Sequence, residues 1–468
     1  MYSIVHLAAE CYPIAKVGGL GDVVGALPKY LNKAGKKSCV VMPRYNNKWN
    51  YDHPSESVFE ASFGNENYHI NFHVVKPVNS GLDFDVYFID IPYLLFREGV
   101  YGYHDDHLRF IYFQQAALHW LQSWDIKPEL VHCHDYHTGL IPFMMNHCYD
   151  FAQLAGIKTV FTIHNGLYAG SFPHHEVRFL PHFPREAGGL LDWDQQICPL
   201  ATGIKCSNKV TTVSEGYLDE LKFTPNAYNW LYNEYAFKSK GIVNGIDTEL
   251  WNPSTDSYLE ILLKKDLAKF KQKNKEAICQ KIGLNQALPL VVFIGRLNQE
   301  KGGEILVPGI GEFVHQNKEM NFLILGSGNG FIEDQIRHIS ATFPGNIANY
   351  IGYNEGLAHQ LYAASDFLMM PSLVEPCGLN QFYALRYGSL PIVRSTGGLK
   401  DTVVDFGDEG GYGIRFNEPS ASDIVMSLYR ALNLYKDSTK LEAVRNIAVH
   451  LDFSWDKAVQ NYLEIYKV

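Results

Sequence analysis

The chain of 468 residues is 46% hydrophobic and 19% charged, which is typical of a globular protein, and its formal net charge is −10. This negative charge argues against a dedicated nucleic-acid binder, although a few local cations would suffice for a small anionic ligand. The eight cysteines are scattered without a CxxC pair, as in reduced proteins rather than disulfide frameworks. No apolar run reaches about 18 residues, so we expect a cytoplasmic protein that is neither secreted nor membrane-spanning.

Short apolar runs alternate with amphipathic segments along the whole chain, a pattern that predicts parallel sheets built from strand–helix units. In the first half, the predicted strands occupy residues 2–8, 38–42, 86–89, 130–132, 160–163, 210–213 and 242–243. The helices predicted between them occupy residues 22–33, 108–124, 139–148 and 215–221.

The second half repeats this alternation after a turn-forming segment, Asn244-Gly245-Ile246-Asp247. Its predicted strands occupy residues 290–294, 322–325, 347–351, 367–370 and 390–393. Its predicted helices include residues 262–282, 358–365, 380–387 and 455–466. We therefore expect an α/β protein with one domain over residues 1–243, a second over 244–450 and a closing helical segment over 451–468.

The sequence Gly-Gly-Leu occurs near both ends of the chain, at residues 18–20 and 397–399, each time with an Asp and a Val following in register. Each copy follows an apolar run and precedes a predicted helix. Paired glycines at such a turn allow bare amides to approach an anion at a helix N-terminus. The repeat predicts two lobes that face a phosphate-bearing ligand; glycines that only permit tight packing are the alternative.

Two cations, Arg296 and Lys301, follow the strand predicted at residues 290–294. On a strand-end loop they suit a diphosphate, because they would stabilise the negative charge that develops as it departs. The alternative is a solvated basic loop. Their place at the carboxyl end of a strand favours the binding interpretation.

Glu375 follows the strand predicted at residues 367–370 and precedes the next helix. Its carboxylate could accept hydrogen bonds from sugar hydroxyls, while the amides of Cys377, Gly378 and Leu379 face a phosphate. On local grounds alone, a carboxylate that merely complements the helix dipole explains the pattern about as well.

Polar residues gather at two strand ends of the first half, in His134-Asp135-Tyr136-His137 and in His164-Asn165. Such folds place substrate contacts there, although a single histidine would more often be structural. His132-Cys133-His134 also suggests zinc, but no second ligand cluster has suitable spacing, and buried strand-end residues explain it better. Tyr353 could stack on a base or simply lie in the core or at the rim.

Together these motifs resemble the bacterial glycogen synthase and plant starch synthase family of retaining glucosyltransferases, glycosyltransferase family 5. The resemblance runs essentially from end to end. It is carried by Lys16-Val17-Gly18-Gly19-Leu20-Gly21-Asp22-Val23, His134-Asp135-Tyr136-His137, His164-Asn165, Asn244-Gly245-Ile246-Asp247, Gly295-Arg296-Leu297 with Lys301-Gly302, Glu375-Pro376-Cys377-Gly378-Leu379 and Ser395-Thr396-Gly397-Gly398-Leu399.

The resemblance implies a GT-B fold, in which two Rossmann-like, doubly wound parallel-sheet domains face a central cleft and the last helix crosses back to the first domain. It implies that the cations hold the donor diphosphate, that the acids place the glucose, and that Tyr353 stacks on the adenine. The catalytic residues that it implies are Asp22, Asp135, His164, Arg296, Lys301 and Glu375. The substrate-binding residues that it implies are Lys16, Gly18, Gly19, Tyr101, Asn165, Asn244, Tyr353, Cys377, Gly378, Leu379, Thr396 and Gly397.

The chemistry implied by the resemblance is glucosyl transfer from ADP-glucose, or UDP-glucose, to the 4-hydroxyl of an α-1,4-glucan, with retention of configuration. We expect front-face attack because no carboxylate is evidently placed as a nucleophile, and we expect neither a metal cofactor nor a nucleic-acid or membrane partner. Val17, Gly21 and Ala169 depart from the usual bacterial residues, which leaves the donor base and the acceptor length open. A non-catalytic protein that binds glucan or nucleotide is the rival hypothesis, although such a protein would be expected to have lost these charges.

Overall fold

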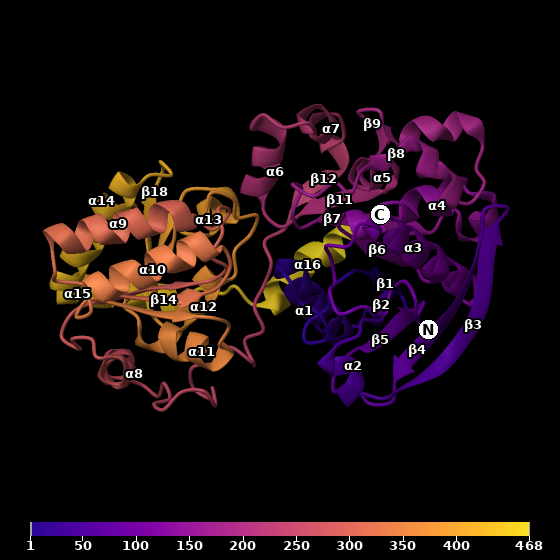
Figure 1. Cartoon of the computed structure of the whole chain (residues 1–468). Coiled ribbons are helices and arrows are strands. Elements are labelled where there is room, and N and C mark those ends of the chain that lie inside the picture. The colour runs from indigo at the N-terminus through magenta and orange to yellow at the C-terminus, as the bar shows by residue number, and fades with distance from the viewer. Residues whose placement is uncertain (1, 468) are drawn as a thin grey trace. The chain divides into compact units, whose positions relative to one another are not determined.

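The computed structural model describes residues 2–467, which form two compact units (Figure 1). Unit 1 contains the described residues up to Val213, then Leu218–Asn244 and the residues from Trp455 onward. Unit 2 contains Ser214–Tyr217 and Gly245–Ser454. Every helix within residues 2–467 falls short of the length and apolar character that crossing a bilayer requires.

The observed division differs from the predicted one at Asn244, which belongs to unit 1, and at residues 214–217 and 451–454, which belong to unit 2. The amide of Gly216 donates to Asp401 Oδ2 at 2.7 Å, which ties the first of these segments to the rest of unit 2. The two ends of the long segment of unit 2 also meet, because the amide of Ile246 donates to the carbonyl of Phe453 at 2.9 Å.

The main sheet of unit 1 has the order β12-β11-β7-β6-β1-β2-β5-β4-β3. It is parallel from β12 to β5, whereas β4 runs antiparallel to both of its neighbours. The strands are β1 (Ile4–Leu7), β2 (Ser38–Pro43), β3 (Ser55–Asn65), β4 (Tyr68–Pro77), β5 (Asp85–Asp90), β6 (Leu130–His134), β7 (Lys158–Ile163), β11 (Lys209–Thr212) and β12 (Ser239–Gly241). A small separate sheet joins β8 (Phe172–Pro173), β10 (Gln196–Ile197) and β9 (Asp192–Trp193).

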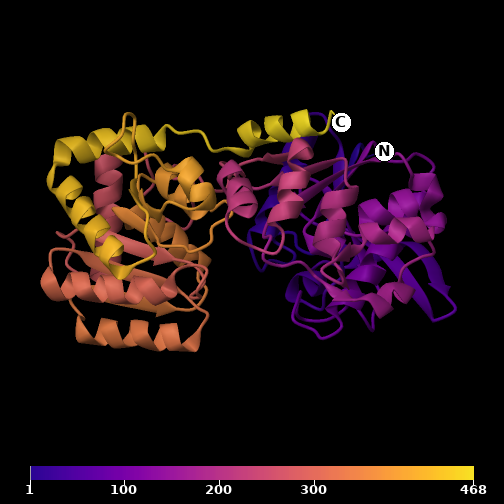
Figure 2. The same cartoon turned by 90° about the horizontal axis from the view of Figure 1, so that it is seen from above.

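Helices cover the sheet of unit 1, and the last helix of the chain is one of them. Tyr30 on α1 and Trp455 and Tyr462 on α16 are buried in one cluster with Ile4 of β1. Figure 2 shows α16 as the yellow helix that ends at the C mark, among the elements of unit 1. The helices are α1 (Gly19–Lys33), α2 (Lys48–Asp52), α3 (Asp106–Ser123), α4 (Ile141–His147), α5 (Pro199–Cys206), α6 (Glu215–Phe223, which starts in unit 2), α7 (Asn229–Glu234) and α16 (Trp455–Ile465).

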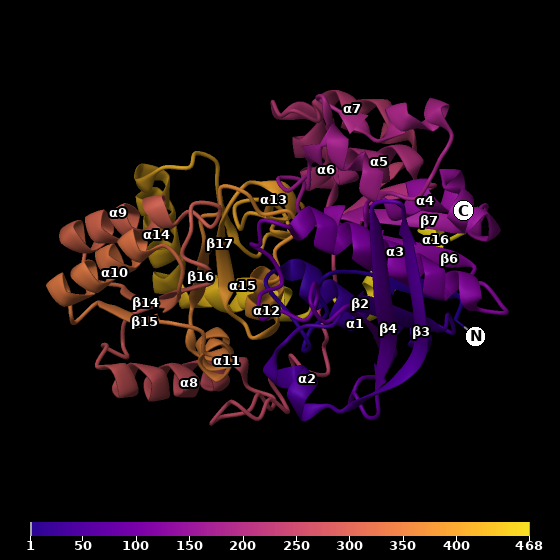
Figure 3. The same cartoon turned by 45° about the vertical axis from the view of Figure 1, so that its right-hand side comes forward.

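Sequence patterning missed the antiparallel hairpin β3–β4, which Figure 3 shows as two long paired strands. Most of β3 is exposed or half-buried, so it carries no apolar run that would mark a strand. The strand predicted at residues 242–243 was wrong, because β12 ends at Gly241 and pairs with β11 through Ser239–Gly241.

Unit 2 contains a fully parallel sheet in the order β15-β14-β13-β16-β17-β18, and Figure 1 shows helices on both of its sides. The strands are β13 (Leu290–Ile294), β14 (Asn321–Gly326), β15 (Ile347–Ile351), β16 (Phe367–Met370), β17 (Leu390–Arg394) and β18 (Ile414–Phe416). The helices are α8 (Leu267–Ile282), α9 (Gly303–Gln316), α10 (Gly330–Thr342), α11 (Glu355–Ala364), α12 (Asn380–Arg386), α13 (Gly397–Thr402), α14 (Ala421–Lys436) and α15 (Ser438–Val449).

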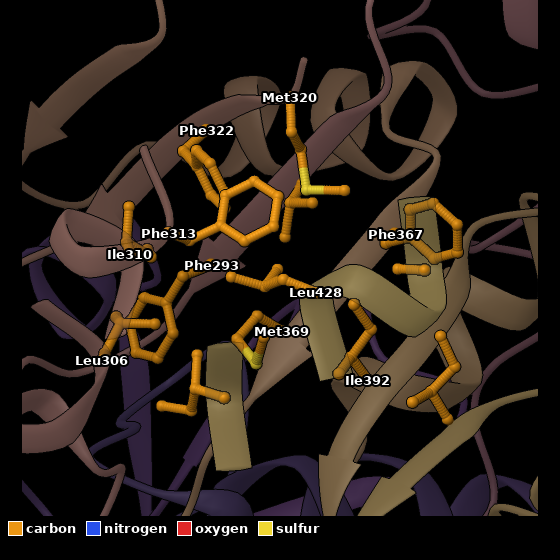
Figure 4. Close-up of a cluster of buried hydrophobic side chains, with 14 of the residues drawn as sticks. Phe293, Leu306, Ile310, Phe313, Met320, Phe322, Phe367, Met369, Ile392 and Leu428 are labelled. Atoms are coloured by element: carbon orange, nitrogen blue, oxygen red, sulfur yellow. The ribbon is translucent and has the colours of Figure 1, made fainter. Parts of the chain in front are cut away.

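Alternate residues of each central strand in unit 2 enter different cores. Phe293 of β13 packs in a cluster with α9 and α14, whereas its neighbour Val292 packs in a cluster with α8 and α11. Figure 4 shows the first cluster, in which Phe293 and Phe322 lie beside Phe313 of α9. Burial on both faces explains why these strands are continuous apolar runs and why they were predicted correctly.

The two Gly-Gly-Leu turns differ in structure. No described heavy atom lies within 4 Å of a Cβ built at Gly18 or Gly19. A Cβ built at Gly398 would instead lie 2.2 Å from the carbonyl oxygen of Cys377, and Gly397 has a φ of 43°. The second turn therefore needs its glycines for close backbone packing, whereas the first turn is open.

Gly398→Ala and Gly19→Ala form a matched pair that tests this difference. Gly398→Ala should lower the free energy of unfolding by about 1–3 kcal/mol, because the added methyl overlaps the Cys377 carbonyl. Gly19→Ala adds a methyl in open space at the first residue of α1, and should change stability by less than about 0.5 kcal/mol. Urea unfolding measures both values; equal effects would contradict the structural difference.

Candidate active site

One buried carboxylate, that of Glu10, fixes the loop between β1 and α1. Its Oε2 accepts the amides of Val17 at 2.6 Å and Gly18 at 2.9 Å, and its Oε1 accepts the hydroxyl of Tyr101 at 2.7 Å. Glu10 is only 3% exposed, and these three hydrogen bonds compensate its burial. Glu10 was not among the residues predicted from the sequence; its place just after the first predicted strand was the signal that could have identified it.

The predicted cation and acid of this loop contact each other. Lys16 Nζ lies 2.6 Å from Asp22 Oδ1, and the Lys16 ammonium also lies 5.5 Å from the centroid of the Tyr12 ring. Both charged side chains are partly exposed, so solvent screens the pair and it adds little to stability. The pair instead keeps a cation positioned beside the open Gly18-Gly19 turn.

Asp135 links the carboxyl ends of two neighbouring strands, β6 and β7. Its Oδ1 accepts the amide of His164 at 2.7 Å and that of Asn165 at 3.4 Å, and its own backbone has a φ of 56°. Burial raises the pKa of the Asp135 carboxyl to about 7, with a contribution from the negative charge of Glu10, although the two amides oppose the shift. Three predicted site residues are thus brought together at this edge of the sheet.

Two further predicted residues of unit 1, Tyr101 and Asn244, differ in their contacts. The Tyr101 ring stacks on His137 with centroids 4.7 Å apart and an interplanar angle of 18°. Asn244 is buried, and its Oδ1 has no hydrogen-bond partner among residues 2–467. A buried amide oxygen without a partner is uncommon, so it is available to a ligand hydroxyl.

A cluster of buried histidines lies behind these strand ends. Ring nitrogens of His6, His132 and His134 lie within 4.8 Å of one another, which would suit a metal ion by distance alone. The His132 and His134 rings are stacked, with centroids 4.1 Å apart and 28° between their planes, whereas His6 meets His134 edge to edge, with centroids 5.4 Å apart. Because imidazole binds metals in the ring plane, nearly parallel stacked rings direct their lone pairs poorly toward one ion. Of these three residues, His132 and His134 stand out in the sequence as a His-Cys-His motif, whereas His6 does not.

In unit 2, the two predicted groups Lys301 and Glu375 form a bidentate ion pair. Lys301 Nζ lies 2.7 Å from both carboxylate oxygens of Glu375, and the hydroxyl of Ser372 donates to Oε2 at 2.8 Å. Glu375 is only 5% exposed, whereas Lys301 retains more contact with solvent. If one partner of such a pair is removed, the other charge is left buried and unpaired, which is unfavourable.

The loop that carries Glu375 is clamped by Gly302 and by Arg394, the second of which was not predicted from the sequence. Arg394 donates to the carbonyls of Ser372 at 2.8 Å and Leu373 at 2.7 Å. Gly302, with a φ of 73°, packs so closely that a Cβ there would lie 2.1 Å from the Pro371 carbonyl oxygen. These contacts hold the loop rigid and place Lys301 beside Glu375.

The Glu375 loop also adjoins the second Gly-Gly-Leu turn. The amide of Gly398 donates to the carbonyl of Glu375 at 3.0 Å, and the Gln381 side chain donates to the carbonyls of Cys377 and Gly378, each at 3.1 Å. The predicted binding groups Cys377, Gly378, Leu379, Thr396 and Gly397 thus lie on two turns in backbone contact.

Arg296 and Tyr353 are the most exposed of the predicted residues in unit 2. Arg296 Nη2 lies 3.3 Å from Glu300 Oε2, and half of its side chain is exposed. Tyr353 is 79% exposed and follows β15. Both side chains are therefore accessible from solvent.

Comparisons with known proteins agree with this architecture. The family description "Starch synthase catalytic domain" matches residues 3–231, and "Glycosyl transferases group 1" matches residues 274–444. The glycogen synthase of Flavobacterium johnsoniae is 46% identical over 99% of this chain and 98% of its own length. That of Streptococcus agalactiae serotype Ia is 39% identical over 99% of each chain.

Solved structures give the same result. The catalytic domain of starch synthase IV from Arabidopsis thaliana, bound to ADP and acarbose, has a TM-score of 0.88 and 32% identity, covering 100% of this chain and 99% of that one. A sucrose-phosphate synthase from Thermosynechococcus elongatus, 14% identical over 100% of this chain and 98% of its own, shares the fold with a TM-score of 0.64.

Two α/β units, each built on a largely parallel sheet with charged loops at its strand ends, define a glycosyltransferase of the GT-B fold. Within that class, the chain belongs to the family of bacterial glycogen synthases and plant starch synthases, which are glucosyltransferases. The predicted fold class and family are both confirmed.

Asp135→Asn tests the titration of the buried carboxyl. The variant loses the titrating group, while its amide oxygen can still accept the His164 amide. Because the pKa of Asp135 rises on folding from about 3.8 to about 7, the folded protein binds the extra proton, and stability falls as pH rises through this window. The unfolding free energy of Asp135→Asn minus that of the wild type should therefore increase from pH 3.8 to about 7 and then level off.

Urea unfolding of both proteins at a series of pH values measures this difference, and contributions from all other groups largely cancel in it. A difference that stays constant across the window would show that Asp135 does not titrate there.

Proposed function

We propose that this chain is an α-glucan synthase that acts in the cytoplasm. It transfers glucose from ADP-glucose to the non-reducing 4-hydroxyl of an α-1,4-glucan and retains the anomeric configuration. Its membership of the glycogen and starch synthase family supports this reaction. The observation that carries the assignment to these residues is the Lys301–Glu375 pair on clamped loops of unit 2.

The chemistry of that pair suits a nucleotide sugar. The Lys301 ammonium, together with Arg296, would bind the donor diphosphate and stabilise the charge that grows on it as it departs. The Glu375 carboxylate would accept hydrogen bonds from the glucose hydroxyls and so fix the sugar relative to its leaving group. The exposed Tyr353 ring would stack on the adenine.

Unit 1 would supply the groups that surround the reacting sugar. Lys16 would bind the distal phosphate, and Asp22, Asp135, His164 and Asn244 would contact the glucose or the acceptor. Oδ1 of Asp135 already accepts two backbone amides, which suits an orienting group better than a nucleophile. We therefore propose front-face attack: the acceptor oxygen bonds to C1, the bond from C1 to the phosphate oxygen breaks, and the departing phosphate takes the acceptor proton.

We propose that lysine and arginine side chains, rather than a resident metal ion, balance the charge of the diphosphate. The cations Lys16, Arg296 and Lys301 are present for this role. We propose neither nucleic acid nor membrane as a partner, because a formal net charge of −10 disfavours attraction to such polyanions.

The experiment that tests this function measures the incorporation of labelled glucose into glycogen from ADP-glucose and from UDP-glucose in competition. We expect incorporation with a preference for ADP-glucose and no loss of rate in EDTA. A clear preference for UDP-glucose would overturn the donor assignment, and loss of activity in EDTA that added divalent metal restores would overturn the metal-free assignment. No incorporation from either donor would favour a protein that only binds glucan or nucleotide.

Lys301→Ala and Glu375→Gln test the roles given to the buried pair. Each change removes one preorganised charged contact, so each should lower kcat by roughly 10²–10³. The matched control is Lys318→Ala, which removes an exposed lysine beyond the opposite end of α9 and should leave kcat unchanged. If both variants fold normally and elongate glucan at the normal rate, the roles of Lys301 and Glu375 are wrong.

A further inference from the structure

Three buried histidines form a hydrogen-bonded chain across adjacent strands of unit 1. His6 lies on β1, His134 on the neighbouring β6, and His164 directly after β7. His6 Nδ1 lies 3.1 Å from His134 Nε2, and His134 Nδ1 lies 3.0 Å from His164 Nε2. His6 and His134 are fully buried, whereas His164 is 8% exposed, so the chain runs from the core to the candidate site.

The three rings are neutral at physiological pH. Burial lowers the pKa of His6 and of His164 to about 3, and it lowers the pKa of His134 well below its ordinary range. A neutral imidazole has one nitrogen that donates and one that accepts. Within the chain, the tautomer of each ring therefore fixes that of the next.

The N–H donors of the three histidines can all point inward, toward His6, or all point outward, toward His164. The environment of His6 at the inner end distinguishes these two arrangements. His6 Nε2 is buried and has no hydrogen-bond partner in the described part of the chain. If the donors pointed inward, this nitrogen would carry a buried N–H without an acceptor. If they point outward, it is a bare nitrogen, His6 Nδ1 donates to His134, and His134 Nδ1 donates to His164. The outward direction is favoured because orphaned buried N–H groups are the rarer kind.

We propose that His6 and His134 are positioning residues that hold His164 in a single neutral tautomer. His164 Nε2 then accepts from His134, and His164 Nδ1 keeps its proton and donates to an oxygen of the bound sugar. The residue presented to the substrate is a fixed hydrogen-bond donor rather than a general base. This inference rests on the proposed function for its sugar ligand, but the tautomer itself does not.

His132 provides an internal comparison. Its ring stacks on His134, but its nitrogens bond outside the chain, to the Tyr466 hydroxyl at 2.8 Å and the Thr162 hydroxyl at 2.6 Å. Tyr466→Phe therefore removes a partly buried hydrogen bond to His132 and leaves the hydrogen bonds among His6, His134 and His164 unchanged.

The kinetic test uses His6→Leu and His6→Asn, which have similar shapes. Asn places an amide group near the position of His6 Nδ1 and can still hydrogen-bond to His134, whereas Leu cannot. We expect His6→Leu to lower kcat roughly tenfold with little change in KM, which corresponds to about 1.4 kcal/mol of transition-state stabilisation. His6→Asn should retain most of the activity, and Tyr466→Phe should match the wild type. Normal kcat in a folded His6→Leu, or no recovery in His6→Asn, would overturn the positioning role.

The tautomer is measured on the unliganded wild-type protein by ¹⁵N NMR of selectively labelled histidine, since protonated and bare ring nitrogens resonate apart. The His164 signals are identified by their loss in His164→Gln. We expect a bare Nε2 and a protonated Nδ1 on His164. A protonated Nε2, or averaging between tautomers, would overturn the inference even if glucosyl transfer is normal. Absence of transfer together with the expected tautomer would overturn the proposed function alone.

Discussion

The constraint on which the candidate site residues of each unit depend is that a buried carboxylate must be hydrogen-bonded or paired. Glu10, Asp135 and Glu375 each lie just beyond a parallel strand and are almost fully buried. Each carboxylate meets this requirement through hydrogen bonds or an ion pair with neighbouring segments of the chain. Glu10 gathers the glycine-rich turn, Asp135 joins the ends of β6 and β7, and Glu375 accepts Lys301 and Ser372. The desolvation penalty of these groups is thus used to fix loop geometry before any substrate arrives.

The sequence predicted the part of the fold that depends on burial alone. Strands buried on both faces appear as apolar runs, so β13, β14, β16 and β17 were located almost to the residue. Half-exposed strands give no such run, so β3 and β4 were missed. Periodicity also cannot show that Ser214–Tyr217 joins unit 2, because that depends on contacts far apart in sequence.

The candidate site divides in a similar way. Charged residues beside glycine turns, such as Lys16, Lys301 and Glu375, stand out in the sequence because their residue types suggest chemistry. The residues that position the site do not stand out in this way. Arg394 donates to carbonyls on another loop, and His6 hydrogen-bonds to a ring on the neighbouring strand. Nor did the sequence reveal that Lys16 and Lys301 each contact a predicted acid of their own unit, Asp22 and Glu375.

The meeting of the two ends of unit 2 has a consequence for the architecture of the family. The chain leaves unit 1 after Asn244 and returns at Trp455, and Ile246 and Phe453 are hydrogen-bonded at the base of the segment between them. Apart from Ser214–Tyr217, unit 2 is therefore an insertion whose entry and exit coincide. Such an insertion imposes almost no loop-closure entropy on its host. Unit 2 can thus vary in sequence without disturbing its host, while α16 completes the core of unit 1 independently of what lies between.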